Sequence, residues 1–230
     1  MSVPCPEPAT EPLRVSVHLP GVEQLIAAHL ARLLRTMPAG TPAVLCIGTD
    51  RSTGDALGPL VGSYLEGWRV GTQVWGTLDR PVHAANLPET MRELLAADVC
   101  PVIAVDACLG VPEQVGTIVV GKGHIRPGAG VNKDLPPVGD LHVTGTVNVA
   151  GYMEYVVLQN TRLSLVMKMA RIAATALALV LPTRPATSSG VSCRGGAPVP
   201  REAKADRLMA AAGPGALPLT PAEGICLPPL

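Results

Sequence analysis

The stretch CIGTDRSTGDALGPLVGSYL, residues 46–65, decides the fold. It joins an apolar run, 43–48, to an amphipathic pattern, 56–69, through the small or polar residues 49–54. The apolar run is typical of a strand buried on both faces of a parallel sheet. In the amphipathic pattern, apolar residues recur at helical spacing and Pro59 falls in the first turn, where a helix tolerates proline. The stretch therefore predicts a strand, a tight turn and a helix, which is the first half of a βαβ unit.

Strand-like and helix-like segments alternate along the rest of the chain. The apolar spacing predicts helices over 21–35, 87–97, 151–159 and 162–181, and strands over 73–78, 102–107, 116–120 and 143–149. The direction of the strand at 116–120 stays open. The alternation predicts an α/β fold, a three-layer α/β/α sandwich with a mostly parallel central sheet.

The two ends of the chain differ from its middle in composition. Residues 1–20 begin with a Pro-rich segment, and residues 182–230 are rich in Pro, Gly and Ala without a sustained period. Such segments bury too little apolar surface to fold alone. We expect both ends to be disordered and the α/β/α domain to cover residues 21–181.

Charge and hydropathy argue against several function classes. The chain has 18 basic and 18 acidic residues, whereas a dedicated nucleic-acid binder is normally basic. Its start lacks the basic and apolar regions of a secretory signal. The charge-free part of its most apolar stretch, 163–181, is too short to cross a bilayer. Its six cysteines form no CxxC pair and are expected to be reduced. These features predict a cytoplasmic protein with neither a nucleic-acid nor a membrane partner.

Two aspartates stand where predicted strands meet the elements that follow them. Asp55 lies at the start of the predicted helix 56–69, and Asp106 lies near the end of the predicted strand 102–107. Ligands of such sheets bind beyond the carboxyl ends of the strands, so neighbouring strands would bring both acids into one crevice. The alternatives are structural, because Asp55 could cap its helix, Asp106 could cap the following loop and Asp50 could form an Asx turn.

Two facing carboxylates have a distinct chemistry. Their repulsion raises one pKa, so that one group is protonated while the other is ionised. The ionised group can take a proton from water, and the protonated one can give a proton to a departing amine. Alternatively, the pair could hold a divalent metal with a histidine. His142, His124 and His83 are the candidates, and each histidine could instead be structural.

The segment 121–141 is long for a loop in a compact domain. Such loops are often lids or binding loops, and Arg126 could bind a peptide carbonyl or carboxylate. The alternative is a disordered crossover. The chain contains neither GxxxxGK[ST] nor GxSxG, so neither a phosphate-binding loop nor a serine-hydrolase turn is supported.

Four segments in order resemble one family, the sporulation protein YyaC family of spore-forming bacteria, whose members are often described as spore proteases. The resemblance covers about residues 20–181. It rests on IGTDRSTGDALGP (47–59), AVDACLG (104–110), HIRPGAGV (124–131) and GDLHVTGTVNVAGYMEY (139–155).

The resemblance implies a relationship to the spore germination protease and, more distantly, to hydrogenase maturation proteases, both α/β/α sandwiches. The germination protease carries a TPDALGP-type turn and an IAVDA strand end, whose functional aspartates match Asp55 and Asp106. In the hydrogenase proteases, acids at these positions bind a metal with a histidine, for which His142 is the best match.

We therefore expect a peptidase of sporulation or germination with Asp55 and Asp106 as catalytic residues. We assign Asp50, Arg126 and His142 to substrate binding. The expected substrate is a protein or peptide, with small spore proteins as candidates. No cofactor is required in this reading, although a divalent metal stays open.

Two other functions fit the same residues. The chain is shorter than a germination protease and shows no counterpart of its activating propeptide. A non-catalytic sporulation protein of this fold could bind a peptide or partner, with the acids organising the crevice. A metal-binding maturation-type factor is the other alternative.

Overall fold

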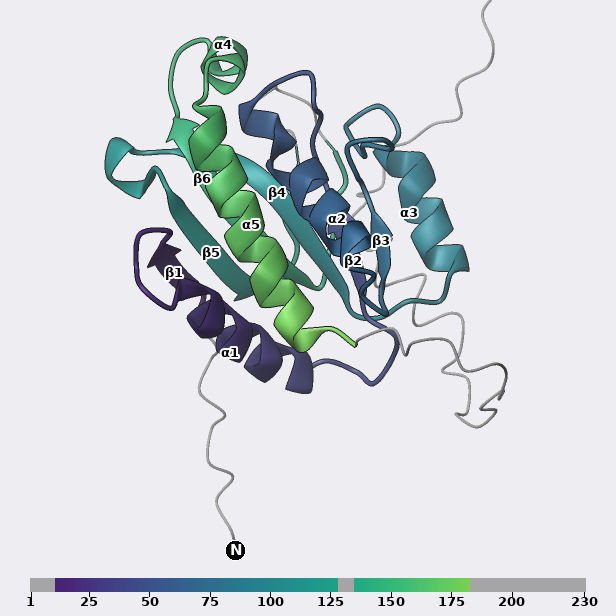
Figure 1. Ribbon diagram of the computed structural model, residues 1–230. Helices are drawn as coiled ribbons and strands as arrows, with labels where there is room; N and C mark the ends of the chain where they lie inside the picture. Colours follow the sequence, from purple (N-terminus) through teal and green to yellow (C-terminus); the bar gives the residue numbers. More distant parts are fainter. Residues whose placement is uncertain (1–10, 128–134, 183–230) are drawn as a thin grey trace, which may run out of the picture.

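The computed structural model describes residues 11–127 and 135–182. They form three layers, with a six-stranded sheet in the middle (Figure 1). Helices α1, α2 and α5 cover one face of the sheet, and α3 covers the other. The expected α/β/α sandwich is confirmed.

The sheet has the strand order β1-β5-β6-β4-β2-β3. Strands β2, β3, β4 and β6 are parallel, whereas β1 and β5 are antiparallel to their neighbours. The direction that the sequence left open for 116–120 is thus antiparallel, and β4 continues beyond its predicted end. The strands are β1 (Leu13–Ser16), β2 (Ala43–Cys46), β3 (Gln73–Trp75), β4 (Val102–Gly110), β5 (Thr117–Lys122) and β6 (Leu141–Val149).

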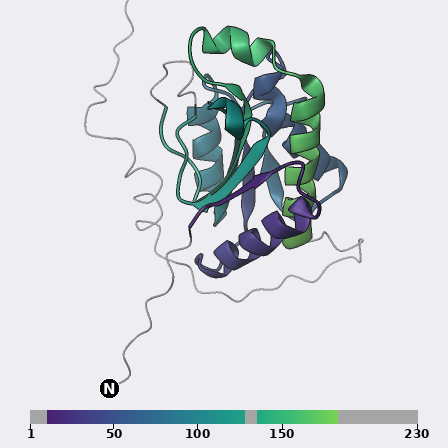
Figure 2. The same cartoon turned by 90° about the vertical axis from the view of Figure 1, so that its left-hand side faces the viewer.

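The helices follow the predicted periodic segments closely. A 3-10 turn precedes α2 and another follows β4. In both views, α4 lies at the end of the molecule where β6 ends (Figures 1 and 2). The helical elements are α1 (Val22–Arg35), α2 (Leu57–Gly67), α3 (Leu87–Ala96), α4 (Glu154–Gln159), α5 (Leu163–Val180) and the 3-10 turns Gly54–Ala56 and Pro112–Gln114.

Alternation along the central strands divides the core into two clusters. In β4, Ile103 and Val105 pack with α1, α2 and α5, while Ala104 packs with α3. Because side chains alternate between the faces of a sheet, the next residue on the α3 face is Asp106. The strand thus supplies apolar residues to both clusters before it presents this acid.

The N-terminal boundary predicted from composition is wrong for the described part of the arm. Within the stretch 1–20, residues 13–16 form β1 at the edge of the sheet, paired with β5. Val15 and Val17 are buried in the core. Residues 1–10 and nearly all of the tail predicted over 182–230 lie outside the described residues.

Helix α5 is a core helix by its contacts. Within the described ranges, it is the one helix long and apolar enough to cross a membrane by length and composition alone, and 44% of its 18-residue window is buried. It packs against α1 and α2, and its buried residues include Met169, Ala173 and Leu177.

Candidate active site

The turn between β2 and α2 brings the helix start back against the end of the strand. Gly48 has a φ of +137°, and a Cβ there would overlap the carbonyl oxygen of Asp55. The N–H of Gly48 donates to the carbonyl of Val82 at 2.8 Å, and the N–H of Thr49 donates to the carbonyl of Asp55 at 3.1 Å. Only glycine fits this close approach with an unstrained backbone. The turn therefore holds Asp55 above the end of β2.

The side chain of Asp55 does not cap a helix. Asp55 lies in the 3-10 turn Gly54–Ala56, and neither that turn nor α2 has a side-chain cap hydrogen bond. The capping alternative for Asp55 is thus wrong. Its half-buried carboxylate lines a pocket instead.

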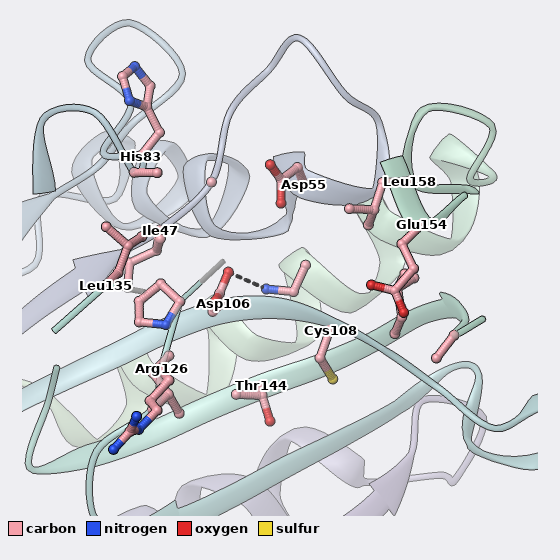
Figure 3. Close-up of a pocket in the computed structure, with 17 residues that line it drawn as sticks. Ile47, Asp55, His83, Asp106, Cys108, Arg126, Leu135, Thr144, Glu154 and Leu158 are labelled. Atoms are coloured by element: carbon pink, nitrogen blue, oxygen red, sulfur yellow. Dashed lines mark hydrogen bonds between the residues drawn. The ribbon is translucent and has the colours of Figure 1, made fainter. Parts of the chain in front are cut away.

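Asp106 enters the same pocket from β4. This strand is the direct parallel neighbour of β2, with Val105 opposite Cys46. The Oδ1 atom of Asp106 accepts a hydrogen bond from the N–H of Ala107 at 2.8 Å. The expected juxtaposition of Asp55 and Asp106 over neighbouring strands is what the structure shows (Figure 3).

The pocket has a volume of about 490 Å³ and mixes acidic groups with apolar walls. This volume lies in the range of small-molecule and side-chain binding clefts. Much of its wall comes from aliphatic residues of the strand ends, the β5–β6 loop and α4. Figure 3 labels ten of its residues, namely Ile47, Asp55, His83, Asp106, Cys108, Arg126, Leu135, Thr144, Glu154 and Leu158.

The two aspartates titrate differently. Burial raises the pKa of Asp106 well above its ordinary value, and the charge of Asp55 raises it further. Burial also raises the pKa of Asp55, but the nearby His83 opposes that rise. Two carboxylates this close cannot both ionise freely, so Asp106 is the member that keeps a proton.

The histidine of the pocket is His83, not His142. His83 directly follows Val82, which pairs with Ile47 at the end of β2. Its Nδ1 accepts a hydrogen bond from the N–H of Ala85 at 3.3 Å, so the neutral ring carries its proton on Nε2. Its place in the loop after a third parallel strand was the signal that could have singled it out.

Two residues assigned to substrate binding lie outside the pocket wall. His142 sits opposite Ala104, two positions before Thr144 on β6, and its Nδ1 donates to the carbonyl of Gly123 at 3.1 Å. Asp50 is exposed in the β2–α2 turn. The preference for His142 at the site is therefore wrong, because His142 is the second residue of β6 and lies near the amino end of the strand, away from the pocket.

Arg126, the third residue assigned to substrate binding, lines the pocket. Its side chain is exposed, and its guanidinium extends away from Asp55 and Asp106 (Figure 3). The flanking residues Ile125 and Val138 form an antiparallel bridge, whereas residues 128–134 of this loop lie outside the described residues.

A third carboxylate and a thiol complete the pocket. Glu154, which the sequence did not single out, enters from α4. Cys108 lies on β4 with its Sγ 3.4 Å from Oγ1 of Thr146, and burial raises the pKa of its thiol. A raised pKa disfavours the thiolate, so Cys108 is a poor nucleophile here.

A metal set of the hydrogenase-protease type does not fit these residues. In the described part of the chain, no group of three or more His, Cys, Asp or Glu side chains is placed to hold a metal ion. His142, the expected third ligand, is bonded elsewhere.

A family comparison assigns the chain. The sequence model of the family "Protein of unknown function (DUF1256)" matches residues 20–176. The chain belongs to the DUF1256 family. "Uncharacterized protein YyaC" of Bacillus subtilis (strain 168) is 56% identical over 144 residues, which cover 61% of this chain and 70% of that protein. The resemblance to the YyaC family is thereby confirmed.

Among solved structures, this DUF1256 protein is similar to the [NiFe] hydrogenase maturation protease HycI from Thermococcus kodakarensis KOD1. The match has a TM-score of 0.47 and 17% identity, and it covers 66% of this chain and 97% of that chain.

Proposed function

We propose that this DUF1256 protein is a peptidase of sporulation or germination that hydrolyses peptide bonds with Asp55 and Asp106. The observation that carries the proposal is the meeting of these two acids in one pocket, where the charge of Asp55 helps to raise the pKa of Asp106. Neither a helix cap at Asp55 nor an ion pair at either acid accounts for their placement among the described residues. The cytoplasm of the sporulating cell is the proposed location.

The unequal pKa values assign the two roles. Asp106 is protonated, and because its Oδ1 accepts the N–H of Ala107, its Oδ2 carries the proton. Asp55 is the ionised member and takes a proton from a water molecule, whose oxygen attacks the peptide carbonyl carbon. When the carbon–nitrogen bond breaks, Asp106 gives its proton to the departing amine. Transfer of the proton from Asp55 to Asp106 through solvent restores the starting state.

The pocket walls suit a peptide rather than a small polar metabolite. Ile47, Leu135 and Leu158 line it together with the acids. Apolar walls exclude water and strengthen electrostatic interactions between the carboxylates and a bound substrate. They also offer contacts to the side chains that flank a peptide bond.

The test compares wild-type protein with Asp55→Asn, Asp106→Asn and the matched control Asp79→Asn. Asp79 is exposed and does not line the pocket. With small spore proteins or casein as substrate, the first two variants should lose on the order of 10²- to 10⁴-fold in kcat, as expected for loss of a general acid or base. The Asp79→Asn variant should cleave like wild type. Equal hydrolysis by all four proteins would exclude the carboxylate mechanism.

A non-catalytic peptide- or partner-binding protein is the second candidate. It is favoured by exposed apolar side chains beside the pocket, namely Tyr152, Met153 and Tyr155 at the start of α4. Clustered exposed apolar residues often mark interaction sites. In this case a stable, uncleaved partner should be recovered from sporulating cells, and Asp55→Asn should change stability more than partner binding.

A further inference from the structure

Glu154 is a carboxylate of the pocket that the two-aspartate mechanism does not use. It is the first residue of α4 and is half-buried. In Figure 3 its carboxylate points from α4 toward the end of β4, above Cys108. The pocket therefore has an acidic group on the wall that α4 supplies, separate from the Asp55–Asp106 pair.

No cation within the protein neutralises Glu154 among the described residues. No ion pair to Glu154 occurs there, and the guanidinium of Arg126 extends away from the acids (Figure 3). Its Oε1 accepts one long hydrogen bond, from the N–H of Gly151 at 3.4 Å. The Oε2 atom is left for another partner. A carboxylate oxygen without a partner in the protein can accept a charge-assisted hydrogen bond from a bound cation.

The surroundings of Glu154 fit a long cationic side chain. Ala150, four residues before Glu154, and Leu158, four residues after it, both contribute apolar wall to the pocket. Lysine and arginine bury an aliphatic stem along apolar surface while their charged end reaches a carboxylate. Outside the pocket, Tyr152 is 91% exposed and Tyr155 is 60% exposed. These rings offer apolar and cation–π contacts to the residues that continue a peptide beyond the pocket.

We propose that Glu154 is a specificity residue that binds a lysine or arginine side chain next to the peptide bond held at Asp55 and Asp106. The proposal rests on the proposed function only in that the ligand is a peptide bound in this pocket. An acidic peptide is disfavoured because the ionised carboxylates of Asp55 and Glu154 line the pocket and would repel it.

Binding and cleavage are measured with fluorescein-labelled peptides that differ at one central residue, Lys, Gln or Glu. Binding is followed by fluorescence anisotropy on the Asp106→Asn protein, so that hydrolysis does not interfere. The Lys peptide should bind about tenfold more tightly than the Gln peptide, the size of one charge-assisted contact. Cleavage of the same peptides by wild-type protein gives kcat/KM for each.

Adding Glu154→Gln to the Asp106→Asn protein should abolish the preference for Lys, and adding Glu154→Lys should shift it toward the Glu peptide. Glutamine keeps an oxygen that can accept the N–H of Gly151, so the turn into α4 is retained. The matched control Glu93→Gln changes an exposed residue of α3 outside the pocket and should leave the preference unchanged. Thermal unfolding midpoints check that each variant is folded.

The outcomes separate this inference from the proposed peptidase activity. If wild type cleaves none of the peptides but the preference in binding follows Glu154, hydrolysis is excluded and the specificity role stands. If wild type cleaves all three peptides with equal kcat/KM, hydrolysis stands and the role of Glu154 is excluded. A preference that survives Glu154→Gln, or no binding of any peptide, also overturns the inference.

Discussion

The β2–α2 turn and the β5–β6 loop both supply pocket walls, but they are built differently. In the turn, residues 47–58 are fixed by close backbone contacts, because Gly48 lies against Asp55 and Gly58 lies against Ile47. In the loop, the described residues between β5 and β6 are joined by an isolated bridge between Ile125 and Val138 and by a hydrogen bond from the N–H of Gly123 to the carbonyl of Asp140. Asp55 is carried by the turn, and the loop contributes Arg126 and apolar wall. Under the proposed function, the residue that activates water thus lies on the crowded segment, and a substrate contact lies on the loop.

The largest expected effect comes from adding a methyl group to the turn. Gly48→Ala combines a φ of +137° with a Cβ that would overlap the carbonyl of Asp55. We expect the free energy of unfolding to fall by at least about 3 kcal/mol, because a strained φ and a steric clash add. Urea denaturation followed by circular dichroism measures this.

The matched control lies in the open loop. Gly123 also has a positive φ, +105°, but a Cβ there would meet nothing within 4 Å. Gly123→Ala should cost only about 1 to 2 kcal/mol, the price of the backbone conformation alone. Equal losses in the two variants would show that crowding in the turn is unimportant and would remove the contrast between the segments.

The second effect is a pH dependence of stability that belongs to Asp106. Because its pKa is raised in the folded protein, the folded state holds this proton more tightly than the unfolded chain does. Its contribution to stability is complete below the ordinary carboxyl pKa and is lost as pH rises toward the raised value. The loss has a slope of up to about 1.4 kcal/mol per pH unit.

Asp106→Asn removes this titration. Relative to wild type, the variant should therefore gain free energy of unfolding as pH rises above about 4, the ordinary value for Asp. Asp55→Asn should act in the same direction over a narrower range, since His83 opposes the rise in the pKa of Asp55. Parallel stability curves for Asp106→Asn and wild type between pH 4 and pH 7 would contradict the raised pKa of Asp106.

The sequence predicted the turn and the two aspartates because the signal for each lies within a short run of consecutive residues. An apolar run that ends at Gly48, and another that ends at Asp106, are visible in a few consecutive residues. The rule that ligands bind beyond the carboxyl ends of parallel strands placed both acids at one edge of the sheet, and it left open whether their strands are neighbours. The structure places β2 beside β4.

The sequence offered three histidines for the site and did not select His83 among them. His83 reaches the pocket because β3 lies beside β2 and Val82 pairs with Ile47, which is a long-range arrangement. His142 shares a sheet face with Thr144, which lines the pocket, but it lies two positions earlier, or about 7 Å along the strand. The sequence predicts which face of the sheet a strand residue occupies more readily than how close to the pocket it lies along the strand.

The edge strand β1 and Glu154 were missed for related reasons. Leu13–Ser16 is short and follows a Pro-rich segment, and its pairing with β5 depends on a partner about a hundred residues away. Glu154 is the first residue of α4, and the sequence did not indicate that this helix supplies a wall of the pocket. Both are set by tertiary packing, which no local pattern records.

The smallest expected effect tests the loop side of the comparison. Arg126 lines the pocket, but its guanidinium extends away from the aspartates (Figure 3). Arg126→Gln should therefore raise KM for a peptide substrate by roughly two- to fivefold, the loss of an exposed charge contact, and leave kcat unchanged. Steady-state kinetics on the wild-type and Arg126→Gln proteins separates the two parameters. A fall in kcat as large as that of Asp55→Asn would place Arg126 in the chemical step and make the loop as much a part of the catalytic apparatus as the turn.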